Sequence, residues 1–173
     1  MRALGVLLVA AGTAMLAGCS YHTVGVATHL PIDAHTLAVP LFATKTNTYH
    51  TEAVMTDAVI REFAARSRLR VTPSDAGEPD VVLRGTILQE SVVPLTYNTS
   101  TQQSSSYLIT VVAAVRLIGR DGQVLYENKG YVFRQQYQST TDLPVYFDES
   151  PAAIERLSHD FARKLVADVL EGL

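Results

Sequence analysis

Residues 107–133 read YLITVVAAVRLIGRDGQVLYENKGYVF, and this segment predicts the centre of a β-sheet. The segment from Tyr107 to Ile118 is rich in apolar and β-branched side chains and predicts a strand. Asp121-Gly122 is a strong signal for a tight hairpin turn, because these residue types tolerate the positive φ angles that such turns require. Residues 123–137 can then return beside the first strand. The stretch therefore predicts a hairpin of two long antiparallel strands.

Three further segments on the N-terminal side predict strands. Residues 80–93 alternate between two faces over their whole length, which indicates a third long strand. Two shorter segments, Leu37–Phe42 and Leu69–Val71, are also typical of strands. Polar segments at 94–106 and 139–150 predict two long loops.

Two helices flank these strands along the chain. In Glu52–Arg66 the apolar residues recur at every fourth position, which gives one apolar helical face. The final helix begins at Ser150-Pro151, where a capping residue precedes a proline at a favoured first position. It runs up to Gly172, and its apolar stripe consists of Ile154, Leu157, Phe161, Leu165 and Val169.

The order of these elements predicts the fold class. A run of strands with a helix near each end favours an α+β, two-layer sandwich with both helices packed on one face of the sheet. We expect a mostly antiparallel sheet of four to five strands, because consecutive long strands joined by short turns pair in this way. The length of 173 residues suits one such domain.

Both faces of the predicted sheet are apolar, although an antiparallel sheet with one wet face should carry polar residues there. In the central strand, the set from Ile109 to Leu117 can face the helices. A partner or a folded-back loop must then cover the opposite face. We favour a partner, because large exposed apolar patches usually mark contacts. The candidate partner-facing residues are Val82, Leu88, Leu108, Val112 and Ile118.

The N-terminus has the layout of a secretory signal, with Arg2 before an apolar run and small residues after it. Leu16-Ala17-Gly18-Cys19 resembles the lipobox of bacterial lipoproteins, in which Cys19 becomes the acylated first residue; the alternative is an ordinary signal with an incidental cysteine. Two or more acyl chains anchor a protein stably. We expect a signal peptide over residues 1–18, a tether over 19–35 and one domain over 36–173.

Composition and spacing argue against several classes of function. Removal of residues 1–18 takes away one basic residue and lowers the net charge from −3 to −4, which disfavours nucleic-acid binding. The five histidines show no metal-ligand spacing, and no nucleophile or phosphate-loop motif is present. We therefore expect a binding or assembly protein without catalytic residues, metal or cofactor.

Several segments together resemble the LptE family of lipopolysaccharide-assembly lipoproteins. They are YHTVG after the lipobox, LAVPLF at 37–42, TEAVMTDAVIREF at 51–63, DVVLRGTI at 80–87 and ESPAAIERLSHDFARKLVADVLEGL at 149–173. The resemblance spans nearly all of the chain after the signal. Thr44 stands where the family commonly has asparagine, so the local loop structure there can differ.

The resemblance implies a location and a partner. LptE-like proteins are anchored in the outer membrane on its periplasmic side, plug and help assemble the β-barrel translocon LptD, and contact lipopolysaccharide. Ser20 after Cys19 agrees with outer-membrane delivery. Phosphate recognition requires accessible Arg or Lys, and the candidates are Arg84, Arg116 and Lys129. Two alternatives remain: a lipid-anchored adaptor of another envelope complex, or a carrier of a hydrophobic ligand, which needs an enclosed apolar pocket.

Overall fold

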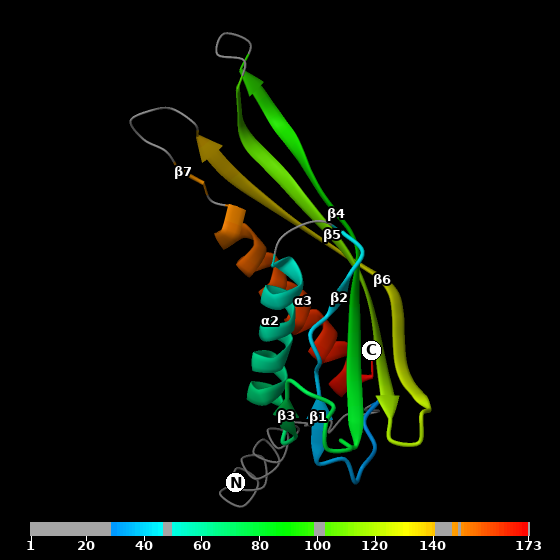
Figure 1. Cartoon of the computed structure of the whole chain (residues 1–173). Helices are drawn as coiled ribbons and strands as arrows, with labels where there is room; N and C mark the ends of the chain where they lie inside the picture. Colours follow the sequence, from blue (N-terminus) through cyan, green and yellow to red (C-terminus); the bar gives the residue numbers. More distant parts are fainter. Residues whose placement is uncertain (1–28, 47–49, 99–102, 141–146, 149, 173) are drawn as a thin grey trace, which may run out of the picture.

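A computed structural model shows two layers, with two helices on one face of a long, twisted sheet (Figure 1). The structure describes residues 29–46, 50–98, 103–140, 147–148 and 150–172. The described elements are β1 (Thr36–Ala38), β2 (Ala43–Thr44), α2 (Thr51–Arg66), β3 (Arg70–Thr72), β4 (Val81–Asn98), β5 (Gln103–Gly119), β6 (Val124–Thr140), β7 (Phe147–Asp148) and α3 (Ser150–Glu171). The predicted α+β class, the two helices and their packing on one face are confirmed.

The sheet is larger and more mixed than the sequence indicates. The described residues form seven of its strands, in the order β3-β1-β4-β5-β6-β7, with β2 also paired to β4. The pairs of β1 with β3, β1 with β4 and β2 with β4 are parallel, whereas the long strands β4, β5 and β6 pair antiparallel. The prediction of a mostly antiparallel sheet of four to five strands was therefore wrong in detail, because short strands at the edges add parallel pairs.

The predicted loop over 94–106 is largely strand. β4 continues to Asn98 and β5 begins at Gln103, so the two form one long hairpin. Its polar residues pair across the hairpin, as Thr96 does with Ser106. Hydrogen bonds between β4 and β5, and between β5 and β6, hold these residues extended although their composition is typical of a loop. In Figure 1 the long strands extend beyond the helices at the upper end of the molecule.

The core lies between the helices and the sheet. α2 contributes Met55, Val59 and Phe63, and the apolar stripe of α3 contributes Leu157, Phe161, Leu165 and Val169; all seven side chains are buried. Their counterpart on β5 is the predicted helix-facing set, Ile109, Val111, Ala113, Val115 and Leu117, which is also buried. The assignment of this face to the helices is confirmed. The opposite face of the sheet, which we call the outer face, is therefore directed away from the helices.

A polar network also ties β6 to α3. Tyr131 donates its hydroxyl hydrogen to Asp168 Oδ2 at 2.5 Å, and Lys164 forms an ion pair with the same carboxylate. Burial of the Tyr131 side chain, followed by its hydrogen bond to Asp168, raises the pKa of its hydroxyl. These contacts fix α3 across β6, so the helix layer stays on the inner face and leaves the outer face open.

The residues that precede β1 also pack on the domain. The backbone N–H of His29 donates to the carbonyl oxygen of Val169 at 3.1 Å, and the His29 ring lies 5.0 Å from that of Tyr126. Leu30 packs against the core. The part of the predicted tether that the structure describes, residues 29–35, thus enters the domain at the C-terminal end of α3.

Candidate functional site

Strand register places the three candidate basic residues together on the outer face. Arg84 on β4 lies directly opposite Arg116 on β5, and Arg116 lies opposite Glu127 on β6. Lys129 follows in an irregular stretch of β6, where the register to β5 shifts. All three basic residues line one surface pocket of about 340 Å³. The structure therefore brings together side chains that lie far apart in the sequence.

Two carboxylates partly neutralise this basic pocket. Arg84 forms an ion pair with Asp75 at 2.7 Å, and Glu127 is shared between Arg116 at 2.5 Å and Lys129 at 3.6 Å. The hydrogen bond from Arg116 lowers the pKa of Glu127 below its ordinary value. Three cations against two carboxylates leave a local excess of one positive charge.

The geometry of the basic pocket suits an anion. Like charges at directly opposite positions of neighbouring strands repel, so an anion bound between Arg84 and Arg116 would relieve the repulsion. Arginine binds carboxylates and phosphates with paired N–H donors, and Lys129 adds a flexible point charge. The basic pocket can therefore bind a phosphate group that competes with exposed, weakly held carboxylates.

The candidate partner-facing residues lie around and above the basic pocket. Val82 is paired with Ile118 below it, and Leu108 and Val112 lie above it on β5. Leu88 differs, because the register jumps from Ile87 to Gln89 and leaves Leu88 as the extra residue of a β-bulge. All five side chains are half-buried in the chain as it stands.

Two exposed valines of the outer face were missed by the sequence analysis. Val93 on β4 lies opposite Leu108, and Val132 on β6 lies opposite Val112. Their side chains remain 47% and 46% exposed. The sequence feature that could have identified Val132 as outward-facing is its position between the inward-facing aromatic residues Tyr131 and Phe133. The register of β6 was needed to show that Val132 borders Val112.

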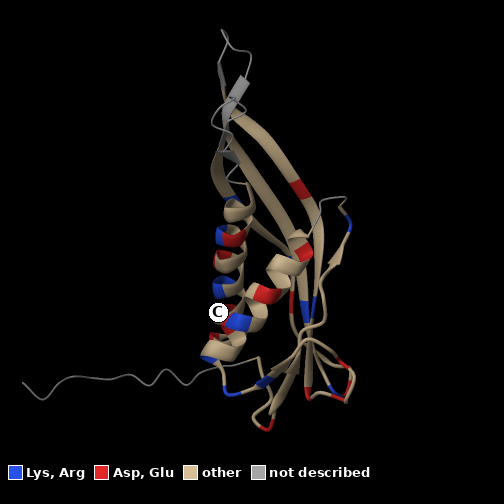
Figure 2. Cartoon of the chain, turned by 60° about the vertical axis from the view of Figure 1, so that its left-hand side comes forward, with Lys and Arg blue, Asp and Glu red and all other residues tan. Residues whose placement is uncertain are grey.

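Charged side chains are unevenly distributed over the molecule. In Figure 2 the ribbon is coloured for Lys, Arg, Asp or Glu at many positions along the helices and near the lower end of the sheet, and at few positions on the upper halves of the long strands. The described upper part of the outer face thus combines apolar and neutral polar side chains and carries few charges. Such a surface is typical of a protein contact.

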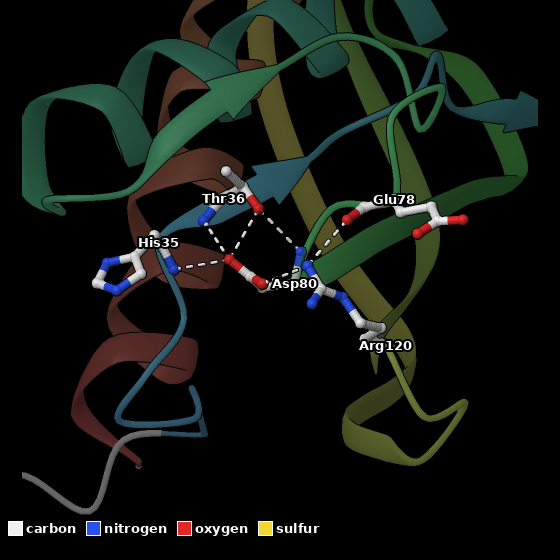
Figure 3. Close-up of polar contacts among 5 residues, drawn as sticks. All are labelled: His35, Thr36, Glu78, Asp80 and Arg120. Carbon is white, nitrogen blue, oxygen red and sulfur yellow. Dashed lines mark hydrogen bonds and ion pairs between the residues drawn. The ribbon is translucent and has the colours of Figure 1, made fainter.

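A second polar cluster holds the lower end of the sheet together (Figure 3). Asp80 Oδ2 accepts hydrogen bonds from the backbone N–H groups of His35 and Thr36, both at 2.9 Å, and from the Thr36 hydroxyl at 2.8 Å. Arg120 bonds Asp80 Oδ1 at 2.7 Å and the carbonyl oxygen of Glu78 at 3.0 Å. The bond from the His35 backbone, then those from Thr36, lower the pKa of Asp80 to about 2. This cluster fixes the start of β1 to β4 and has a structural role.

The space between the helices and the sheet is filled. Phe63, Phe161, Leu37, Met55 and Leu83 are among the largest fully buried side chains there. A surface pocket of about 430 Å³ lies instead between the N-terminal ends of α2 and α3, lined by Val54, Ile154 and neighbouring residues. Large buried side chains therefore occupy the interface between the helices and the sheet over the residues that the structure describes.

The described residues form neither a metal-binding cluster nor a membrane-spanning helix. No cluster of three or more His, Cys, Asp or Glu side chains there could hold a metal ion. Within the same ranges, neither helix is long and apolar enough to cross a membrane.

Comparison with solved structures gives the same fold at low identity. An uncharacterized lipoprotein B from Nitrosomonas europaea matches with a TM-score of 0.53 and 11% identity, over 82% of this chain and 84% of that one. A putative lipoprotein from Caulobacter crescentus matches with a TM-score of 0.50 and 13% identity, over 74% of this chain and 86% of that one. A protein from Xanthomonas campestris matches with a TM-score of 0.50 and 16% identity, over 83% of this chain and 90% of that one. No curated protein matches the sequence.

The comparison with protein families gives one match. The family model described as "LptE: Lipopolysaccharide-assembly" matches residues 34–169, which include every described strand and nearly all of α3. The match covers most of the chain, and the resemblance seen in the sequence is confirmed. The chain therefore belongs to the LptE family of lipopolysaccharide-assembly proteins.

Proposed function

We propose that this chain is an outer-membrane lipoprotein that plugs a LptD-like β-barrel, helps to assemble it and supports lipopolysaccharide transport. The observation that carries the proposal is the outer face, where apolar residues of three long strands stay half-exposed. The family's role in lipopolysaccharide assembly supports the choice of partner. A partner surface packed on the outer face would remove these side chains from water, at roughly 25 cal/mol per Å² of apolar surface.

Anchoring by Cys19 fits this arrangement. The first described residues, beginning with His29, enter at the C-terminal end of α3, and the end of β4 and the start of β5 lie at the opposite end of the molecule (Figure 1). A lipid at Cys19 would hold the lower end near the inner leaflet. The hairpin would then be free to extend into a barrel.

The basic pocket is the proposed contact for lipopolysaccharide phosphates. Arg84, Arg116 and Lys129 supply the donors, and their exposed ion pairs with Asp75 and Glu127 are weak enough to be exchanged. Purified protein with Arg84→Gln and Arg116→Gln should bind lipopolysaccharide more weakly than the parent, whereas Arg163→Gln on the exposed side of α3 should not change binding. Equal binding by all three proteins would exclude the basic pocket.

The barrel contact is tested by a charge on the outer face. Val112→Asp should leave the free domain folded, because Val112 lies outside the core, and should weaken the complex, because an unpaired charge buried at an interface is costly. Circular dichroism measures folding, and co-purification from detergent-solubilised membranes measures the complex. Ile32→Asp is the matched control, because Ile32 is fully exposed before β1.

The results of these experiments distinguish three alternatives for the outer face and its partner. Loss of folding by Val112→Asp would mean that the outer face belongs to the core of the domain. Normal folding with normal binding would place the plug interface elsewhere. Co-purification of the parent with a different envelope protein would favour the adaptor alternative.

A further inference from the structure

The described upper half of the outer face contains one arginine among uncharged neighbours, three apolar and two polar. Arg134 on β6 lies opposite Thr110 on β5. Val132 and Gln136 precede and follow it on the same face of β6, because side chains two residues apart share a face. The register makes Val112 and Leu108 its diagonal neighbours on β5. Arg134 itself is exposed.

Arg134 differs from the other basic residues of the outer face in its lack of a counter-charge. Arg84, Arg116 and Lys129 each have a carboxylate partner. Arg134 forms no ion pair or side-chain hydrogen bond with any residue that the structure describes. It lies about 20 Å from Arg116 along the strand direction, so the basic pocket and its carboxylates are out of reach.

The uncharged surroundings make this arginine unusual. On the outer face of β4, β5 and β6 above the β4 bulge, the described side chains other than Arg134 are apolar or neutral, namely Gln89, Ser91, Val93, Ser106, Leu108, Thr110, Val112, Val132, Gln136 and Gln138. A partner that covered this surface would also bury the guanidinium group. Burial of an unpaired cation is costly, so such a partner must supply an anion at this position.

We infer that Arg134 is the ionic anchor of the outer-face interface and pairs with an aspartate or glutamate on the barrel partner. This inference rests on the proposed function. A protein carboxylate fits better than a lipid phosphate, because this position offers a single cation among uncharged side chains, whereas the basic pocket offers three cations. Arginine surrounded by apolar contacts is a common energetic centre of protein interfaces.

The full-length lipoprotein in complex with its barrel provides the test. Arg134→Gln should weaken the complex by about tenfold or more, because truncation leaves the partner carboxylate buried without a counter-charge. Arg134→Glu should weaken it further. Arg163→Gln, on the exposed side of α3, should leave the dissociation constant unchanged. Unchanged affinity for Arg134→Gln would overturn the inference.

Chemical cross-linking tests the identity of the anion. In the Arg134→Lys complex, a carbodiimide should couple the new amine to a barrel carboxylate, and mass spectrometry should identify the bond. The same reagent should give no such bond from Arg163→Lys. An assembled Arg134→Lys complex without the cross-link would overturn the inference, as would loss of lipopolysaccharide binding by isolated Arg134→Gln with normal barrel binding.

The two proposals fail in different ways. If Val112→Asp disrupts the complex and Arg134→Gln does not, the outer face is the interface but Arg134 is not its anchor. If neither substitution has an effect, the interface lies elsewhere and both proposals are wrong.

Discussion

Truncation of Phe161 to alanine should be one of the most damaging single changes to the fold. The Phe161 side chain is fully buried on α3 and meets three other rings edge-on. The ring centroids lie 6.2 Å from Phe42, 5.7 Å from Tyr131 and 5.6 Å from Phe133, with interplanar angles near 90°. These rings come from the segment after β1 and from β6, so Phe161 joins distant parts of the chain.

The magnitude follows from burial and ring contacts. Phe→Ala in a core costs about 3–5 kcal/mol through lost transfer energy and the remaining cavity. Each edge-on ring pair adds about 0.5–1.5 kcal/mol to the stability beyond the buried area. The cost of Phe161→Ala should therefore not lie at the lower end of the range of about 3–5 kcal/mol. We expect a loss of about 4 kcal/mol in the free energy of unfolding. For a chain of this size, that corresponds to a decrease in Tm of about 8–16 °C.

Thermal unfolding of the chain from residue 19, followed by circular dichroism, is the assay. Arg163→Ala is the matched control, because Arg163 is exposed on the same helix and its loss should leave Tm nearly unchanged. Phe161→Leu, which keeps part of the volume, should fall between the parent and Phe161→Ala. A Tm for Phe161→Ala within about 2 °C of the parent would refute the assignment of this helical face to the core.

Three further predictions concern other parts of the chain. Gly85→Ala should destabilise the domain by about 1–3 kcal/mol in chemical denaturation, because its Cβ would lie 2.5 Å from the Phe42 ring; Phe42→Leu should recover part of the loss, and an unchanged midpoint would contradict this packing. Asp80→Asn should have a lower free energy of unfolding than the parent at pH 7, because the ionised Asp80 carboxylate stabilises the fold. This difference in stability should shrink as the pH falls from 3.8, the ordinary pKa of the carboxyl, through about 2, its pKa in the folded chain. A difference that does not change with pH would contradict the prediction. Cys19→Ser should lose its membrane anchor, and mass spectrometry of the mature N-terminus that finds an unmodified Cys19 in the parent would disprove lipidation.

Local sequence patterns predicted the two helices and the three long strands, and the inward faces of α2, α3 and β5. The four-residue spacing of α2 and the stripe of α3 predicted the buried sides, because a helix must place its apolar residues on one side to join a core. The alternation around Ile109 predicted the helix-facing side of β5 in the same way. The apolar character of the outer face was also visible, although the sequence could not show its upper extent.

The α+β class, the central hairpin, the buried faces of the two helices and the family resemblance could all be predicted from the sequence, because each depends on short-range periodicity or on motifs within one segment. Only the tertiary structure decided which distant residues meet. The parallel pairs of β1 with β3 and β4 join segments that local patterns cannot align. Residues 94–98 and 103–106 belong to a segment whose composition predicts a loop, and they become strand through pairing with their neighbours. The pairing of Arg84 with Arg116 and the isolation of Arg134 likewise depend on strand register, which a single bulge shifts by one residue and no local pattern records.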